Sequence, residues 1–164
     1  MEMGLLECAI YLIYPSLLGW LFNAVAVYFP AAFTFVYYLA PIFLFVGWFW
    51  AGKRYACRIS NPVIGILIGN SIGILSIAVY LWQEYITTNK INWLQQAAQY
   101  FSASLTPLTV SVVAQFSPTV DGVTQVSNTA LQLLGFILVV MAFIGGYFYQ
   151  RNKTKLEQKE TRKL

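Results

Sequence analysis

NPVIGILIGNSIGILSIAVYLWQ, residues Asn61 to Gln83, is the stretch that decides the fold. It holds about twenty apolar residues, enough to cross the hydrocarbon core of a bilayer as a helix. Gly65, Gly69 and Gly73 recur at every fourth position, so they share one face, and small residues on such a face let a second helix approach closely. Asn70 lies beside that face, where a buried amide either bonds to a neighbouring helix or contacts a substrate or ion.

The composition of the whole chain agrees with a membrane protein. Of the 164 residues, 59% are hydrophobic and 10% are charged, whereas about a quarter of the residues in a soluble domain are charged. Histidine is absent, and the two cysteines, Cys8 and Cys57, lie far apart. Most zinc sites, haem ligation by histidine and Ser-His or Cys-His catalysis are therefore excluded. We predict that the protein is not an enzyme and has no catalytic residue, cofactor or metal site.

The predicted fold class is an all-α membrane protein, a four-transmembrane-helix bundle with an extra amphipathic or re-entrant helical segment on the outer side. Each apolar run has the length of a bilayer-spanning helix, and no soluble domain stands apart from them. We expect one transmembrane domain over residues 1–149, followed by a basic cytoplasmic tail over residues 150–164. The expected spans are about 5–28, 32–50, 62–82 and 123–149, and the outer segment is about 92–117.

The outer segment over 92–117 is the ambiguous part of the chain. Apolar residues recur along it at steps of three and four, and Gln, Ser and Thr recur on another face. This pattern indicates an amphipathic helix and not a uniformly apolar span. Three interpretations stay open: a cap lying in the membrane interface, a polar stripe that lines a water-accessible vestibule, and a fifth span.

The basic residues indicate the orientation of the spans. Lys53, Arg54 and Arg58 follow the second span, and the tail over 150–164 carries six more of the ten basic residues, which leaves only Lys90. With four spans, the first three and the tail fall on one side, and the positive-inside rule makes that side cytoplasmic. We therefore expect both termini in the cytoplasm, with a bacterial plasma membrane as the default location. Clusters that flank apolar spans do not indicate nucleic-acid binding.

Uncharged polar residues predict a pocket that faces outward. The start of the last span is unusually polar, and the stripe of the outer segment would lie opposite to it. Such a pocket suits an uncharged polar solute or a weakly held cation, because amides and hydroxyls carry no charge near neutral pH. The candidate pocket residues are Asn70, Gln99, Ser102, Thr106, Asp121, Gln125, Asn128 and Gln132.

Two functions from different classes follow from these observations. The predicted function is a non-catalytic subunit or assembly partner within a membrane complex, because the glycine face offers a surface to another helix. The alternative is a transporter or channel for a small solute or ion, formed by oligomerisation. The expected partners are the lipid bilayer and other membrane protein chains, not nucleic acid. The two functions differ in where the glycine face points, inward to the same chain or outward to another.

Overall fold

The computed structural model describes residues 5–161, apart from the side chains of residues 5, 6 and 159, and it is almost entirely helical. The only strands among these residues form one short hairpin. In chain order the elements are α1 (Leu5–Tyr28), α2 (Pro30–Arg58), α3 (Pro62–Gly69), α4 (Ser71–Leu81), the π-helical turn η1 (Trp82–Ile86), α5 (Asn92–Ala103), α6 (Thr106–Val113), the 3₁₀ turn η2 (Ala114–Phe116), β1 (Thr119–Val120), β2 (Val123–Thr124) and α7 (Asn128–Thr161).

Three helices are long and apolar enough to cross a membrane. These are α1, α2 and α7, with the apolar segments Glu7–Tyr28, Pro30–Arg58 and Asn128–Gln158. The pair formed by α3 and α4, with η1, passes the same test together but is bent by 56°. The described chain therefore has three helices that fit a membrane span, or four when the bent pair counts as one.

An asparagine stands at each end of α3, and the second of them lies at the bend between α3 and α4. Asn61 caps α3, because its Oδ1 accepts from the backbone N–H groups of Val63 at 3.0 Å and Ile64 at 3.4 Å. Asn70 ends α3 with φ −108° and ψ 13°, outside the helical region. Its own Nδ2 donates to the carbonyl of Ile66 at 2.9 Å, a local bond that competes with the helical pattern.

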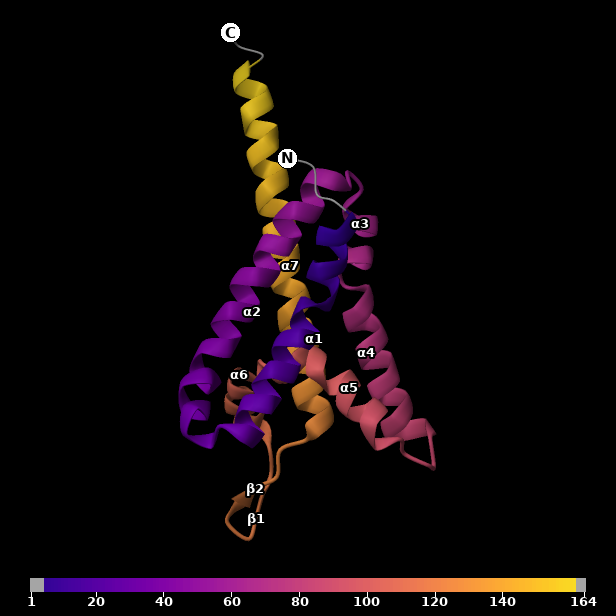
Figure 1. Cartoon of the computed structure of the whole chain (residues 1–164), viewed down its shortest axis with the longest axis vertical. Helices are drawn as coiled ribbons and strands as arrows, with labels where there is room; N and C mark the ends of the chain where they lie inside the picture. Colours follow the sequence, from indigo (N-terminus) through magenta and orange to yellow (C-terminus); the bar gives the residue numbers. More distant parts are fainter. Residues whose placement is uncertain (1–4, 162–164) are drawn as a thin grey trace.

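The core lies where α2 and α7 run side by side (Figure 1). Trp48 and Tyr55 of α2 and Phe143 and Tyr147 of α7 are all buried there. The two backbones come close at a glycine, since a Cβ added to Gly146 would lie 1.9 Å from the carbonyl oxygen of Phe49. Residues with side chains would keep the helices further apart, so glycine sets this spacing.

The helical hairpin made by α5 and α6, residues 92–113, lies against α1, α4 and α7. Its tip, at Ser104 and Leu105, is 0% exposed. Glycines from the three surrounding helices make room for it. An added Cβ would lie 1.8 Å from the Tyr100 carbonyl oxygen at Gly19, 2.4 Å from the Phe101 ring at Gly73, and 2.7 Å from Ser102 Cβ at Gly135.

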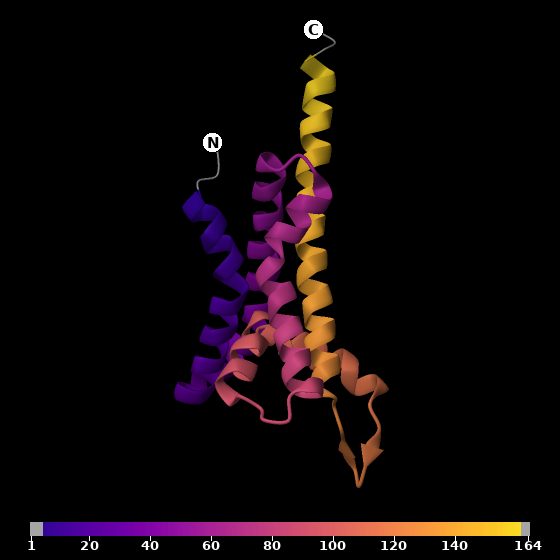
Figure 2. The same cartoon turned by 90° about the vertical axis from the view of Figure 1, so that its right-hand side faces the viewer.

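The ends of the chain lie on one side of the molecule (Figures 1 and 2). Helix α1 begins and α7 ends toward the same end, and the hairpin β1–β2 projects at the opposite end. That hairpin turns at Asp121 and Gly122, whose φ values of 52° and 78° fit a two-residue turn. The last part of α7 extends past all the other helices in both views.

The element boundaries differ from the expected spans in three places. Helix α2 continues through the basic segment to Arg58, where a loop was expected after about residue 50. Residues 123–127, expected to open the last span, are not helical: 123 and 124 form β2, 125–127 have no regular structure, and α7 begins only at Asn128. The tail over 150–161 is a direct continuation of α7, because nothing in it interrupts the helix: it contains neither glycine nor proline.

Candidate functional site

A cavity of about 300 Å³ lies beside the α5–α6 hairpin, among residues near the end of α1 and the starts of α2 and α7. Side chains from α1, α2, α5, α6 and α7 line it. Its apolar walls include Phe22 of α1 and Phe33 of α2, whose ring centroids lie 5.3 Å apart. Its polar lining consists of Asn23, Gln96, Gln99, Ser102, Thr106, Thr109, Asn128 and Gln132.

The serine and threonine hydroxyl groups of the cavity donate hydrogen bonds within the protein. Ser102 Oγ donates to Gln132 Oε1, which joins α5 to α7 in the cavity lining. Thr106 Oγ1 donates to the carbonyl of Ala103 at 2.7 Å, across the turn of the hairpin. Thr109 Oγ1 lies 3.2 Å from the carbonyl of Leu105. These bonds help to fix the hairpin and use the single O–H donor of each hydroxyl, whose oxygen can still accept a hydrogen bond.

Four side-chain amides in the cavity are not used in this way. Asn23, Gln96, Gln99 and Asn128 all line it, and none of their side chains hydrogen-bonds to another residue in the part of the chain described. Each amide has two N–H donors and one carbonyl acceptor. The cavity therefore presents both donors and acceptors without a partner, and these are available to water or to a solute.

The lining of the cavity is uncharged. Among its described lining residues there is no Asp, Glu, Lys or Arg. Amides do not exchange protons near neutral pH, so this arrangement can bind and orient a molecule but supplies no general acid or base. Its volume of about 300 Å³ lies at the small end of ligand pockets.

The structure brings together five of the eight residues expected in the pocket: Gln99, Ser102, Thr106, Asn128 and Gln132. The other three lie elsewhere. Asn70 is 2% exposed and accepts a hydrogen bond from the Trp48 indole N–H at 3.3 Å. Asp121 lies at the tip of the β-hairpin, and Gln125 is exposed after β2, because the chain turns outward before α7 begins.

Three polar lining residues were not among those expected in the pocket: Asn23, Gln96 and Thr109. Two of them carried a sequence signal. Gln96 precedes Gln99 by three positions and Thr109 follows Thr106 by three, so each shares a helix face with an expected residue. Asn23 is a single polar residue in a long apolar run, and nothing in the sequence indicates that it faces α5.

The predicted helix-packing glycines face the inside of the chain. An added Cβ would lie 2.7 Å from the ring of Tyr147 at Gly65, and 2.1 Å from the ring of Phe143 at Gly69. Gly73, described above, faces Phe101. Aromatic side chains of the same chain therefore occupy the space where a second backbone was expected. This placement removes the main sequence argument for docking of another chain on that face.

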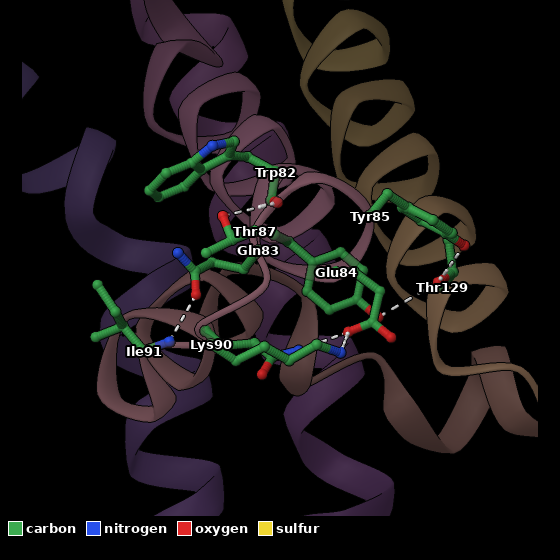
Figure 3. A network of polar contacts seen from close by, with 10 residues as sticks. Trp82, Gln83, Glu84, Tyr85, Thr87, Lys90, Ile91 and Thr129 are labelled. Atoms are coloured by element: carbon green, nitrogen blue, oxygen red, sulfur yellow. Dashed lines mark hydrogen bonds and ion pairs between the residues drawn. The ribbon is translucent and has the colours of Figure 1, made fainter.

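A polar network holds the connection between α4 and α5 (Figure 3). Glu84 Oε2 accepts from Lys90 Nζ at 2.9 Å and from Gln95 Nε2 at 2.8 Å. Gln83 Oε1 accepts from the backbone N–H of Ile91 at 2.8 Å. Glu84 follows the apolar part of α4, and its hydrogen bond from Lys90 holds the pKa of its carboxyl below the ordinary value. The network fixes the start of α5 and so the position of the Gln96 and Gln99 face.

Thr129 ties the same region to the start of α7. Tyr85 OH donates to Thr129 Oγ1 at 3.0 Å (Figure 3), and Tyr80 OH lies 3.4 Å from the same oxygen. Because Thr129 directly follows Asn128, these contacts help to hold the α7 side of the cavity.

We compared the chain with protein-family models, with curated proteins and with solved structures. None of these comparisons found a match.

Proposed function

We propose that the chain is an integral membrane protein with four spans: α1, α2, the bent pair α3–α4, and α7. The lengths and hydropathy of these helices support this arrangement. The α5–α6 hairpin then enters the membrane from the outer side and returns to it. Such a re-entrant hairpin is tolerated in a bilayer only when protein covers it, and its tip is 0% exposed.

The function we propose for this protein is the binding of a small, uncharged polar solute in the outward-facing cavity. The observation that carries the proposal is the set of four unpartnered amides around one cavity: Asn23, Gln96 and Asn128 are exposed and Gln99 is half-buried, so their donors and acceptors are open to a solute. Ser102 and Gln132 are joined by a hydrogen bond in the cavity lining, and Phe101 and Leu105 of the same hairpin are buried. Transport through the same site requires the hairpin tip to move; binding alone does not.

The test is the accessibility of a cysteine placed in the cavity. In a background with Cys8→Ser and Cys57→Ser, Gln99→Cys is exposed to a membrane-impermeant maleimide added from the outer side. We expect rapid labelling, because the cavity is open to that side. Uncharged sugars, polyols and amides are then used as probes, and a solute that occupies the cavity slows the labelling. Asn128→Ala with Gln132→Leu should abolish that protection.

Ser104→Cys is the matched control, since Ser104 belongs to the same hairpin but is 0% exposed at its tip. We expect its labelling to be at least about a hundredfold slower, because a buried thiol reacts only through local opening. Equal labelling rates for Gln99→Cys and Ser104→Cys would contradict the proposal that Gln99 lines a cavity open to the outer side. Protection that survives in the Asn128→Ala, Gln132→Leu variant would place the solute elsewhere.

The subunit function has separate support in the end of α7. This helix continues past Gln150 to Thr161, beyond all the other helices (Figure 2), and its only described ion pair there is Lys153 with Glu157 at 3.8 Å. An isolated helical end of this length is marginal in water, so a partner surface would stabilise it. The mass of the particle extracted gently from its native membrane tests this: a heteromeric particle, lost on deletion of residues 151–164, supports the subunit function.

A further inference from the structure

A second hollow lies on the other half of the molecule, between α2 and α7. Its volume is about 230 Å³, and Trp50, Lys53, Arg54, Cys57 and Gln150 line it. It therefore combines two cationic side chains with an aromatic ring. In the proposed membrane arrangement it lies at the cytoplasmic interface, where the headgroups of anionic lipids are found.

Aromatic rings hold the two cations of this hollow in place. Lys53 Nζ lies 5.4 Å from the centroid of the Trp50 ring and 5.2 Å from that of the Tyr149 ring. Arg54 Cζ lies 5.9 Å from the Trp50 ring centroid. Neither cation forms an ion pair with a carboxylate among the residues described. Both side chains are half-buried, and the aromatic rings fix the positions of their positive charges. No carboxylate among the described residues neutralises these charges.

An apolar groove continues from the hollow along the same seam. Its volume is about 440 Å³, and its lining is Phe45, Val46, Phe49, Trp50 and Ala142. Trp50 lines both spaces, so the cationic hollow and the apolar groove are adjacent. From Phe45 to Arg54 they follow about 14 Å of α2, at a rise of about 1.5 Å per residue. A cationic end and an apolar trough in this order match a headgroup followed by an acyl chain.

We infer that this seam is a binding site for one anionic phospholipid. The phosphodiester lies against Lys53 and Arg54, and one acyl chain lies in the groove beside Phe49 and Ala142. The inference rests on the proposed membrane placement but not on the solute cavity, which opens at the opposite end. Charge complementarity selects the occupant: two cations without a carboxylate partner favour a phosphate diester that carries a net negative charge over a zwitterionic headgroup.

Native mass spectrometry of the detergent-solubilised full chain tests the inference. The probes are dioleoyl phosphatidylglycerol, dioleoyl phosphatidylcholine, dihexanoyl phosphatidylglycerol and glycerol 3-phosphate. We expect one dioleoyl phosphatidylglycerol per chain, bound at least about tenfold more tightly than phosphatidylcholine, because two cations contribute to the headgroup. The short-chain lipid should bind at least about tenfold more weakly, because it fills less of the groove.

Variants separate this site from a general surface charge. Lys53→Gln with Arg54→Gln should lower phosphatidylglycerol binding at least about tenfold, and Lys153→Gln with Lys155→Gln, which removes the same charge from the exposed part of α7, should change it less than about twofold. Equal losses in the two pairs would overturn the inference. Equal affinity of the unmodified chain for the two dioleoyl lipids would also overturn the inference. This comparison needs no variant, so it holds even if a variant does not fold. Binding of glycerol 3-phosphate as tight as that of the lipid would identify a free-phosphate site.

Discussion

Asn70 lies at the bend between α3 and α4 and also reaches α2. Its side chain donates to Ile66 and accepts from Trp48 at a position that is 2% exposed. We predict that Asn70→Leu lowers the free energy of unfolding by about 1–3 kcal/mol, because it leaves the indole N–H of Trp48 buried without a partner. Unfolding in mixed micelles, followed by circular dichroism, measures this loss.

The control for Asn70 is a double-mutant cycle with Trp48→Phe. Removing both partners leaves no orphaned donor, so the double variant should lose less than the sum of the two single losses. A strictly additive loss would mean that the bond between Asn70 and Trp48 contributes nothing specific to the bend.

At the scale of elements, two adjacent glycines of α7 differ in what surrounds them. An added Cβ at Gly146 would meet the Phe49 carbonyl oxygen at 1.9 Å, whereas at Gly145 its nearest neighbour is the Phe49 ring at 3.9 Å. We predict that Gly146→Ala forces α2 and α7 apart and costs about 1–3 kcal/mol of unfolding free energy or more. Gly145→Ala should cost nothing and gain up to about 1 kcal/mol from its helix propensity. The unfolding free energies of the two variants are measured under the same conditions. Equal effects would contradict the close approach of the α2 and α7 backbones at Gly146.

The connection between α4 and α5 should depend on pH through Glu84. Its pKa is lowered in the folded protein by the hydrogen bond from Lys90, so the carboxylate stabilises this connection at neutral pH. That contribution is lost as the pH falls through the lowered pKa. We predict that the stability difference between the unmodified chain and Glu84→Gln narrows as the pH falls from about 7 to about 3. Thermal unfolding at several pH values measures it; a difference that stays constant would exclude Glu84 as the titrating group.

At the scale of the whole molecule, the β1–β2 hairpin and the end of α7 lie at opposite ends (Figures 1 and 2). If the basic side is cytoplasmic, cysteines placed at the two ends should be labelled from opposite sides. In the cysteine-free background we predict that Thr119→Cys reacts with an impermeant maleimide in intact cells, and that Asn152→Cys reacts only after permeabilisation. Labelling of both from one side would contradict the four-span arrangement.

Periodicity in the sequence was enough to predict helices and a polar stripe. It could not predict which residues would pack against each helix face. The stripe on 92–117 and the polar start of the last helix supplied five residues of the cavity, because residues at steps of three and four share a face. Asp121 and Gln125 are close to Asn128 in sequence, yet the β-hairpin carries them away from it. The closest contacts of backbone with backbone involve glycines such as Gly52 and Gly146, whose neighbours in space are far away in the chain. No local pattern could have identified them.

The place of α7 after the α5–α6 hairpin in the chain has a consequence for biosynthesis. Translation begins at the N-terminus, so the α5–α6 hairpin is made before α7 exists. Until then the Ser102 hydroxyl lacks its acceptor on Gln132, and the Phe101 ring lacks Phe136, which lies 6.3 Å away in the finished protein. Unpaired polar groups are costly in hydrocarbon, so in the proposed arrangement we expect the newly made hairpin to stay at the aqueous boundary until α7 inserts. In the proposed membrane arrangement, insertion of α7 is therefore the event that completes the cavity, because Asn128, Leu131 and Gln132 of that helix line it.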